Sequence, residues 1–469
     1  MKDRLDGIAP GPRGVAWIRS AFGLQGREPV RYLLEWTREY GEVVRFRVGQ
    51  SVFHLLNDET SARHVLQLNY RNYTKSRNFD EIRRVLGNGL LTSEGEFWLR
   101  QRRLAQPAFH PDRLAACAGT VVEATERRLN AWAGIAASNE PIDVHEAMLG
   151  LTLGIVGRIL FGVDLEQEES RVGPALTVLM RHANRRLRAI VKLPTAVPTP
   201  GERRFKRALR ELDELVLRII RERAASDHDR GDLLSMLLRV RDAETGEPMS
   251  EAQVRDEVMT LLLAGHETTA GALSWTFHVL SQYAEVQQQM HREVDDVLGG
   301  RPPGYADLTR LEYTRRVLQE AMRLYPPAWF IERQAIADDI VCGFHIPAGS
   351  LVGISPYTLH RNPRLWPDPE RFDPDRFRPE LSADRSRFAY LPFGAGPRVC
   401  IGAGLAMLDA HLILAMVAQR FTIASDPAHT VELEPLTTLR PRTGVRVRLS
   451  RRAPAAQELS WSGSGSVIA

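Results

Sequence analysis

A single cysteine in a glycine-rich turn is the residue of this chain best suited to do chemistry. Cys400 lies in the stretch FGAGPRVCIG, residues 393–402, and an apolar run with helical spacing, LAMLDAHLILAMVAQRF, follows it. A thiolate there would lie near a helix N-terminus, where backbone N–H groups and the helix dipole favour negative charge. Gly394, Gly396 and Gly402 would let a flat group approach the sulfur, because glycine has no side chain. Taken alone, a cysteine in a loop is more often a buried free thiol.

The spacing around this cysteine is more informative than the cysteine itself. Phe393, Gly396, Arg398, Cys400 and Gly402 form the pattern F-x-x-G-x-R-x-C-x-G. This pattern resembles the haem-binding loop of the cytochrome P-450 family, the haem–thiolate monooxygenases. The resemblance implies b-type haem (iron protoporphyrin IX) with Cys400 as the proximal metal ligand. It also implies haem contacts from Phe393, Arg398 and Gly402.

A long helix is predicted upstream, with polar residues in its apolar middle. SEAQ at 250–253 forms a capping box, and helical spacing continues to Tyr283. The central run LLLAGHETTAGAL contains Glu267 and Thr268, which are costly to bury unless they are satisfied. HExxH zinc chemistry is excluded, because Ala270 stands where the second histidine is needed.

The resemblance makes Glu267 and Thr268 the catalytic acid–alcohol pair that serves oxygen activation. Leu261, Ala264, Thr268 and Ala272 share one helical face by their spacing. In the family this face looks onto the haem, so Ala264 is predicted to contact it.

Two arginines and a tryptophan are candidate contacts for the haem propionates. Trp98 and Arg102 are four residues apart on a predicted helix, and both side chains donate hydrogen bonds suited to carboxylates. Taken alone, they could equally be a surface cation–aromatic pair. The family's W-x-x-x-R pair implies the propionate role, and Arg333, ten residues beyond Arg323, is a third candidate.

Glu320 and Arg323 form an E-x-x-R pair, and Arg371 follows in a P-E-R-F string. An E-x-x-R pair alone is a common surface ion pair. In the family these parts form a buried triad that supports the haem loop. The resemblance therefore predicts structural roles for Glu320, Arg323 and Arg371.

The predicted substrate pocket is apolar, which favours a lipophilic substrate: a fatty acid, terpenoid, steroid or polyketide. The AGHETT form of the long-helix motif resembles family members that oxidise fatty acids. The candidate lining residues are Phe79, Ile82, Leu86, Leu90, Leu261, Ala264, Ala328, Trp329, Phe330 and Ile331.

Composition excludes several other classes of protein. The 469 residues carry 62 basic and 58 acidic side chains, a net charge of +4, which argues against a nucleic-acid binder. Three scattered cysteines form no disulfide framework and fit a reducing cytoplasm. The N-terminal sequence MKDRLDGIAPGPRG has no apolar signal or span, so a soluble, bacterial-type monomer without a membrane anchor is expected.

The expected fold is mainly α with small β-sheets, as in the cytochrome P-450 fold. Residues 1–449 are predicted to form a single domain that encloses haem between the long helix and the cysteine loop. Residues 450–469 are expected to be a disordered tail. Helical spacing predicts a helix at 29–40, strand residues predict a hairpin over 42–56 about Gly49 and Gln50, and 342–359 is expected to form a second small sheet.

The implied reaction inserts one oxygen atom from O2 into a C–H bond or a double bond. Only about 70 residues follow the cysteine loop, too few for a reductase domain. Electrons are therefore expected from NAD(P)H through a separate ferredoxin or flavodoxin and its reductase. A haem peroxygenase or isomerase on the same fold is the alternative, but such relatives often lack the acid–alcohol pair. A dinucleotide loop at the GAG string is weak without a preceding strand and a later acid.

The segment 181–210 is the most basic part of the chain. A solvated helix surface is the first interpretation of such a segment. The second is attraction of an acidic partner, an anionic substrate or a membrane surface. The basic residues are Arg181, Arg185, Arg186, Arg188, Lys192, Arg203, Arg204, Lys206, Arg207 and Arg210.

Overall fold

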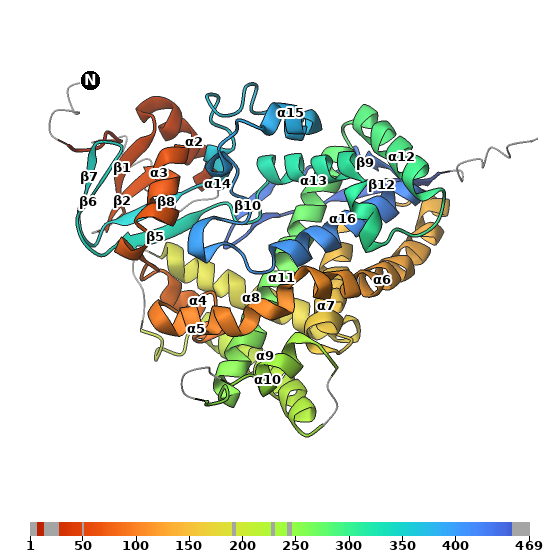
Figure 1. The fold of residues 1–469 in the computed structure, drawn as a ribbon, viewed down its shortest axis with the longest axis horizontal. Coiled ribbons are helices and arrows are strands. Elements are labelled where there is room, and N and C mark those ends of the chain that lie inside the picture. Colours follow the sequence, from red (N-terminus) through yellow and green to blue (C-terminus); the bar gives the residue numbers. More distant parts are fainter. Residues whose placement is uncertain are drawn as a thin grey trace, which may run out of the picture.

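The computed structural model describes residues 7–13, 28–48, 51–189, 194–226, 230–241 and 246–452. The turn residues Gly49 and Gln50, Lys192 and most of the predicted tail, 453–469, lie outside these ranges. Within them the chain is helix-rich with small sheets, as the sequence predicts (Figure 1). The strands within residues 43–56 and 331–354 lie at one edge of the molecule, beside the N-terminal helices, whereas the strands at 421–425 and 446–451 lie on the opposite side.

The helices of the described chain are α2 Pro29–Tyr40, α3 Glu59–Arg63, α4 Phe79–Leu86, α5 Gly95–Ala105, α6 Pro111–Ser138, α7 Val144–Phe161, α8 Glu169–Arg188, α9 Pro200–Ala224, α10 Leu233–Arg239, α11 Glu251–Leu280, α12 Ala284–Leu298, α13 Glu312–Leu324, α14 Pro356–Leu359, α15 Pro379–Ser382 and α16 Ala403–Arg420. The strands are β1 Val43–Val48, β2 Ser51–Leu56, β3 Tyr73–Thr74, β4 Ile142–Asp143, β5 Ile331–Ala335, β6 Asp339–Val341, β7 Phe344–Ile346, β8 Leu351–Ile354, β9 Phe421–Ser425, β10 Leu433–Pro435, β11 Leu439–Pro441 and β12 Arg446–Arg451.

The largest sheet has the strand order β1-β2-β8-β5-β3. The predicted hairpin is confirmed, since β1 and β2 pair antiparallel from Val43 opposite Leu56 to Val48 opposite Ser51. The prediction of a separate sheet over 342–359 is partly wrong. β6 and β7 do form their own two-stranded sheet, but β8 pairs parallel with β2 and so joins the first sheet, and 356–359 is helical.

The long helix α11 is the central element of the core. Its start is confirmed: Ser250 accepts from Gln253 N–H, and Gln253 completes the capping box. It ends at Leu280, three residues before the predicted Tyr283. Helices α7, α9, α13 and α16 all pack against it, so α11 runs through the main hydrophobic cluster with most of its surface covered.

Among the described residues, two helices are apolar and long enough to cross a membrane by length and composition, α7 and α16. Both are mostly buried inside the fold, 72% and 67% of the apolar window respectively. Their hydrophobicity is therefore accounted for by the protein core.

Candidate active site

The Cys400 loop is a tight turn that glycine makes possible. Gly396 has φ +69°, and a Cβ there would lie 1.8 Å from the Leu66 carbonyl oxygen, so no side chain fits. The backbone N–H of Cys400 donates to the Phe393 carbonyl at 3.0 Å and closes the loop. Gly402 is the N-cap residue of α16, so the sulfur lies just before a helix N-terminus, as predicted.

The electrostatics of Cys400 favour a ligand on its sulfur. Burial among protein atoms raises the pKa of the thiol, while the Gly402 N–H and the Arg102 guanidinium oppose the rise. Yet part of the Cys400 surface is exposed. Both observations hold together if the sulfur faces a space enclosed by protein. A thiolate in such a position is stabilised when it binds a cation or a metal.

The middle of helix α11 also has an exposed surface within the core, as the Cys400 loop does. Ala264 is exposed and Thr268 half-buried, although Leu261, Leu262, Leu263 and Ala270 around them are buried. The Thr268 hydroxyl donates to the Ala264 carbonyl at 2.5 Å, as helix hydroxyls often do. The small side chain at position 264 leaves this face of the helix open to a flat ligand.

Glu267 turns away from this face toward a second region of polar residues. Its Oε1 accepts a hydrogen bond of 2.7 Å from the Thr438 hydroxyl, and Arg440 Nη1 lies 3.8 Å from the same oxygen. Glu267 also lines a cavity of about 820 Å³ together with His145, His266 and Arg440. Glu267 and Thr268 therefore stand next to each other in sequence but face different surroundings.

The histidines of this cavity are neutral near pH 7. Burial lowers the pKa of both His145 and His266 to about 4. His266 Nδ1 is buried without a hydrogen-bond partner among the described residues. The cavity is polar enough to hold ordered water, which would satisfy such groups.

A cluster of cations lies beside the cysteine loop. Arg398 donates to Glu94 at 2.6 Å and to the Ser93 carbonyl at 2.9 Å, and its guanidinium carbon lies 3.8 Å from the centre of the Trp98 ring. Burial first, and then the positive charge of Arg398, lower the pKa of Arg333 to about 10. Burial and the positive charges of Arg333 and Arg398 also hold the pKa of Lys75 well below its ordinary value.

Lys75, Arg333 and Arg398 together carry more positive charge than their acidic neighbours offset. Glu94 is the carboxylate that opposes all three. Glu332 also opposes Arg333, but its oxygens already accept from Ser76 and Asn78. These three cations exceed the two carboxylates by one charge, so the donor set of the cluster fits a further carboxylate such as a haem propionate. Arg102 lies next to it, since its positive charge lowers the pKa of Arg398, and it donates to the Val399 carbonyl at 2.8 Å.

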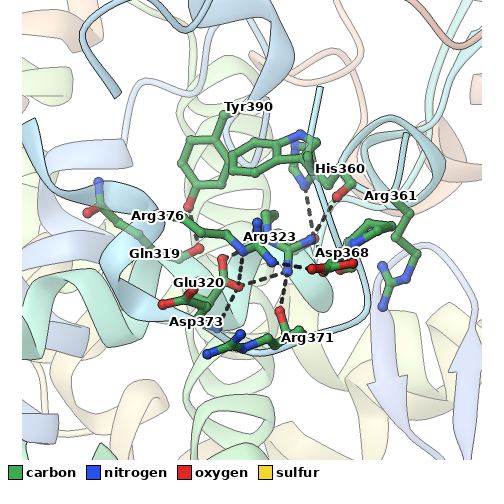
Figure 2. Close-up of polar contacts among 12 residues, drawn as sticks. Gln319, Glu320, Arg323, His360, Arg361, Asp368, Arg371, Asp373, Arg376 and Tyr390 are labelled. Carbon is green, nitrogen blue, oxygen red and sulfur yellow. Dashed lines mark hydrogen bonds and ion pairs between the residues drawn. The ribbon is translucent and has the colours of Figure 1, made fainter. Parts of the chain in front are cut away.

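The predicted triad is present in part (Figure 2). Arg323 and Glu320 are fully buried and form a bidentate pair, with N–O distances of 2.7 and 2.8 Å. Arg323 also donates to the carbonyls of His360, Pro369 and Arg371 at 2.8, 2.7 and 3.1 Å.

The assignment of Arg371 as the third buried side chain is wrong. Its side chain is exposed, and only its carbonyl joins the network. Arg376 takes the third position, with Nε 3.4 Å from Glu320 Oε1 (Figure 2). The strings DPERF (368–372) and DPDRF (373–377) follow each other directly. The turn at Asp373 directs the second string toward Glu320, whose Oε1 accepts the Asp373 N–H at 2.9 Å.

The candidate pocket residues divide into two groups. Phe79, Ala328, Phe330 and Ile331 are half-buried, and Ile82, Leu90 and Leu261 keep 6–8% of their surface exposed. Leu86 is fully enclosed in the core, so its assignment as a lining residue is wrong in this structure. Trp329 packs in the cluster of α2, β1 and β2 and donates its indole N–H to the Leu436 carbonyl at 2.7 Å.

Phe330 is held against the sheet. A Cβ on Gly353 of β8 would lie 2.3 Å from Phe330 Cζ, so the ring occupies the space that the glycine leaves. Ile331 follows it, and its Cδ1 lies 3.8 Å from the Cβ position of Gly394 in the cysteine loop. The start of β5 thus passes the cysteine loop, as the pocket prediction requires.

Sequence reasoning missed four residues of this site: Lys75, Glu94, Thr438 and Arg440. None stands in a motif, and each comes from a segment distant from the residues it meets. Thr438 and Arg440 are more than 170 residues beyond Glu267. A lone lysine, glutamate or threonine has no spacing signal, so only the fold could identify them.

The fold and the cysteine-centred site define a haem–thiolate protein, and comparison with known proteins gives its family. The family model "Cytochrome P450" matches residues 9–447. Cyclooctatin synthase of Streptomyces melanosporofaciens is 40% identical, covering 92% of this chain and 93% of that protein. Cyclooctat-9-en-7-ol 5-monooxygenase of the same species is 39% identical, covering 86% and 87%. Pentalenene oxygenase of Streptomyces avermitilis is 33% identical, covering 96% and 98%.

The solved structures agree with the sequence relatives. The haem domain of cytochrome P450DA superposes with a TM-score of 0.86 at 27% identity, covering 95% of this chain and 98% of that one. The chain belongs to the cytochrome P450 family. It is a haem–thiolate monooxygenase that acts on a lipophilic small molecule, uses haem and O2, and takes electrons from NAD(P)H through redox partners.

Proposed function

We propose that this enzyme oxygenates a cyclic terpenoid at a site built from Cys400, Thr268 and Glu267. Support for the substrate class comes from the relatives, three of which carry names of terpenoid-modifying enzymes. They favour a terpenoid over the fatty acid that the AGHETT motif suggested. The apolar, half-buried side chains of Phe79, Ala328, Phe330 and Ile331 suit a hydrocarbon skeleton.

The observation that carries the proposal is the pair of environments at Glu267 and Thr268. Thr268 belongs to the open face of α11 beside Ala264, whereas Glu267 reaches the polar cavity. We propose that Thr268 holds and passes protons on the open face. Glu267 receives them from water in the cavity, and Thr438 and Arg440 position its carboxylate. General acid–base groups of this kind contribute about 10²–10⁴-fold to a rate.

Cys400 is the proposed iron ligand, with Phe393, Gly402 and Ala264 against the haem. Trp98, Arg102, Arg333 and Arg398 are the proposed propionate contacts, and Lys75 joins them. When bound, a thiolate-ligated haem receives electron density from the sulfur and favours cleavage of the O–O bond. The protein residues orient the substrate, exclude bulk water and supply protons.

The remaining proposals concern the partners and the setting. A separate ferredoxin or flavodoxin with its reductase is the proposed electron source, and Arg103, exposed on α5, is a candidate contact for an acidic carrier. We propose that the protein is a cytoplasmic monomer without a membrane anchor. Its three cysteines are free, in keeping with a reducing compartment. The proposed domain extends through β12, because Ser450 and Arg451, which the sequence assigned to the tail, pair with Thr422 and Phe421 of β9.

The test of the substrate class is a binding and turnover screen on the haem-loaded protein. Cyclic diterpenes and sesquiterpenes, a fatty acid and a steroid are added while the haem absorption is followed. Products are then identified with a surrogate ferredoxin and reductase. We expect cyclic terpenes to shift the spectrum and to yield oxygenated products. Turnover of the fatty acid or steroid alone would contradict the terpenoid proposal and leave the reaction class intact.

A further inference from the structure

The cavity of about 820 Å³ that Glu267 reaches is a separate space from the predicted haem site. Its lining comes from α6, β4, α7 and the start of α8, with Arg440 of β11 and with His266 and Glu267 of α11. Cys400, Ala264 and Thr268 do not line it. Sites for small molecules typically have volumes of about 300–1,000 Å³, so this cavity is large enough to be one.

The cavity combines a buried apolar part with an opening at the surface. Trp132, Ile142 and Leu176 are buried lining residues that offer apolar surface to a ligand. Other lining residues are exposed, which places them at the opening: Ala131, Glu146, Ser170 and Pro174. A small molecule can therefore enter from solvent and bury a hydrocarbon skeleton against the apolar part.

Helix α8 contains two residues that disfavour a helix at the place where it borders the cavity. Gly173 and Pro174 both line the cavity and both lie inside the helix, where glycine and proline are unfavourable. A Cβ on Gly173 would meet no atom within 4 Å, so the glycine leaves open space. Proline has no N–H, so the Ser170 carbonyl lacks its helical donor. Such unfavourable residues often mark a functional position.

The cations of the lining already have acidic partners, whereas several hydrogen-bonding atoms have none. Arg128 Nη2 lies 3.2 Å from Glu166 Oε1, and Arg440 Nη1 lies 3.8 Å from Glu267 Oε1. In the described structure, His266 Nδ1 and Arg128 Nε are buried without a partner, and Glu267 Oε2 has no donor. A hydroxyl group both donates and accepts, whereas an ammonium group only donates and a carboxylate only accepts. The lining therefore fits an uncharged alcohol better than an amine or an acid.

We propose that this cavity is a second ligand site, which binds a lipophilic alcohol and thereby slows proton delivery to the haem site. The hydrocarbon skeleton lies against Trp132 and Leu176, and the hydroxyl donates to Glu267 Oε2. A ligand in this position displaces the water from which Glu267 takes protons. An oxygenated terpenoid is an alcohol of this kind, so the enzyme's own product can act as its inhibitor. The effect on proton delivery rests on the role of Glu267 under the proposed function, whereas the binding itself does not.

Binding is measured by calorimetry on the haem-loaded protein saturated with clotrimazole, an azole that ligates the iron and fills the haem pocket. The probe is the sesquiterpene alcohol cedrol, and the comparison is cedrane, the hydrocarbon with the same skeleton. We expect a single site for cedrol. Cedrane should bind about 10- to 100-fold more weakly, because it cannot donate a hydrogen bond to the Glu267 carboxylate.

A variant that fills the cavity shows whether cedrol binds there. Gly173→Leu places a side chain in the open space and should weaken cedrol binding by at least about tenfold, because overfilling a packed space is unfavourable. Gly119→Leu on α6 is the matched control. Gly119 is exposed, its Cβ would also meet no atom within 4 Å, and it does not line the cavity. This control should bind cedrol within about twofold of wild type.

The effect on proton delivery is measured during turnover with a surrogate ferredoxin and reductase. The substrate is the cyclic terpene that gives the largest shift of the haem spectrum, with and without cedrol. Product per electron pair should fall and hydrogen peroxide should rise as the second site fills, because acid–base groups contribute about 10²–10⁴-fold to a rate. The spectral shift caused by the substrate should persist, since the two ligands occupy different spaces. Gly173→Leu should not respond to cedrol, and Gly119→Leu should respond as wild type does.

The absence of cedrol binding to the clotrimazole-blocked wild type overturns the proposal, as does equal binding to Gly173→Leu. Equal affinities for cedrol and cedrane overturn the alcohol as the ligand. Should Gly173→Leu fail to fold, Ala131→Phe, at an exposed lining position, provides the same test.

Binding without a change in peroxide yield overturns the effect on proton delivery, and Glu267→Gln then identifies which proposal failed. Normal coupling in Glu267→Gln means that the role of Glu267 under the proposed function is wrong. Release of peroxide by Glu267→Gln leaves that role intact and overturns the inhibition by a bound alcohol alone.

Discussion

Two buried ionic clusters of this protein, one around Glu320 and Arg323 and one around Arg333 and Arg398, differ in whether their charges are matched. In the pair of Glu320 and Arg323, each donor and each acceptor has a hydrogen-bond partner. The carbonyls of His360, Pro369 and Arg371 accept the arginine N–H groups that do not bind Glu320 alone (Figure 2). Around Arg333 and Arg398, neighbouring positive charges lower the pKa of Arg333 and of Lys75, and Glu94 is the shared acid.

The contrast separates a structural cluster from a binding cluster. A matched buried pair contributes to a unique fold and needs nothing from outside the chain. An unmatched cluster costs stability until a ligand of opposite charge arrives. The excess of positive charge beside Cys400 therefore belongs to the cofactor site, and the Glu320 network belongs to its support.

The largest expected effect is the loss of the metal ligand. Cys400→Ser should abolish the strongly red-shifted absorption of the reduced carbon monoxide complex, because serine is a hard, poor ligand at neutral pH. The control is Cys342→Ser, at an exposed cysteine on the β6–β7 turn, which should keep the full signal. A variant of Cys400 that retained the red-shifted band would remove this residue from the site.

Breaking the matched cluster should be costly to the fold. Arg323→Leu leaves Glu320 buried without its partner, so the free energy of unfolding should fall by about 3–5 kcal/mol. Urea unfolding followed by circular dichroism measures this. Arg371→Ala is the matched control: its side chain is exposed and its carbonyl is kept, so the change should stay within about 0.5 kcal/mol. A large loss in the control would restore Arg371 to the triad.

Removing the hydroxyl on the open face of α11 should separate electron use from product formation. Thr268→Ala should still bind haem and substrate and consume reduced cofactor. Product per electron pair should fall by roughly tenfold or more, with hydrogen peroxide rising to match, because proton delivery is lost. Peroxide and product are assayed together. Thr269→Ala, a buried neighbour, is the control. Normal coupling in the Thr268 variant would mean that this hydroxyl only makes a hydrogen bond within the helix, to the Ala264 carbonyl.

A smaller effect is expected from the unmatched cluster. Lys75→Met should weaken haem binding by roughly 10- to 100-fold, the value of one charge-assisted hydrogen bond, without lowering the stability of the haem-free protein. The rate of haem transfer to an excess of a haem scavenger measures the first effect. Unchanged transfer would show that Lys75 does not contact the cofactor.

The same variant has a distinct pH signature. The folded pKa of Lys75 lies well below its unfolded value, so the unfolded chain holds more protons between the two. Stability of the haem-free protein should therefore rise with pH across that range. Lys75→Met should remove this part of the rise, and urea unfolding at several alkaline pH values would detect it. An unaltered pH profile would mean that Lys75 is not desolvated.

The sequence by itself determined the parts of this protein whose signal is local. The spacing around Cys400, the capping box of α11, the Glu320–Arg323 pair and the β1–β2 hairpin each depend on residues close together in the chain. Backbone geometry makes such residues neighbours in any fold that contains the element. These predictions agree with the described structure to within a few residues at the ends of the elements.

Only the tertiary structure decided which distant residues meet. Arg371 and Arg376 stand in nearly identical strings, and the choice between them depends on the direction of the chain after Asp373. Lys75, Thr438 and Arg440 have no spacing pattern to identify them. The basic residues of 181–210 likewise lie near one another only because α8 and α9 pack side by side. Charges and hydrogen-bond partners act through space, over a few ångströms, and the order of residues along a chain does not state those distances.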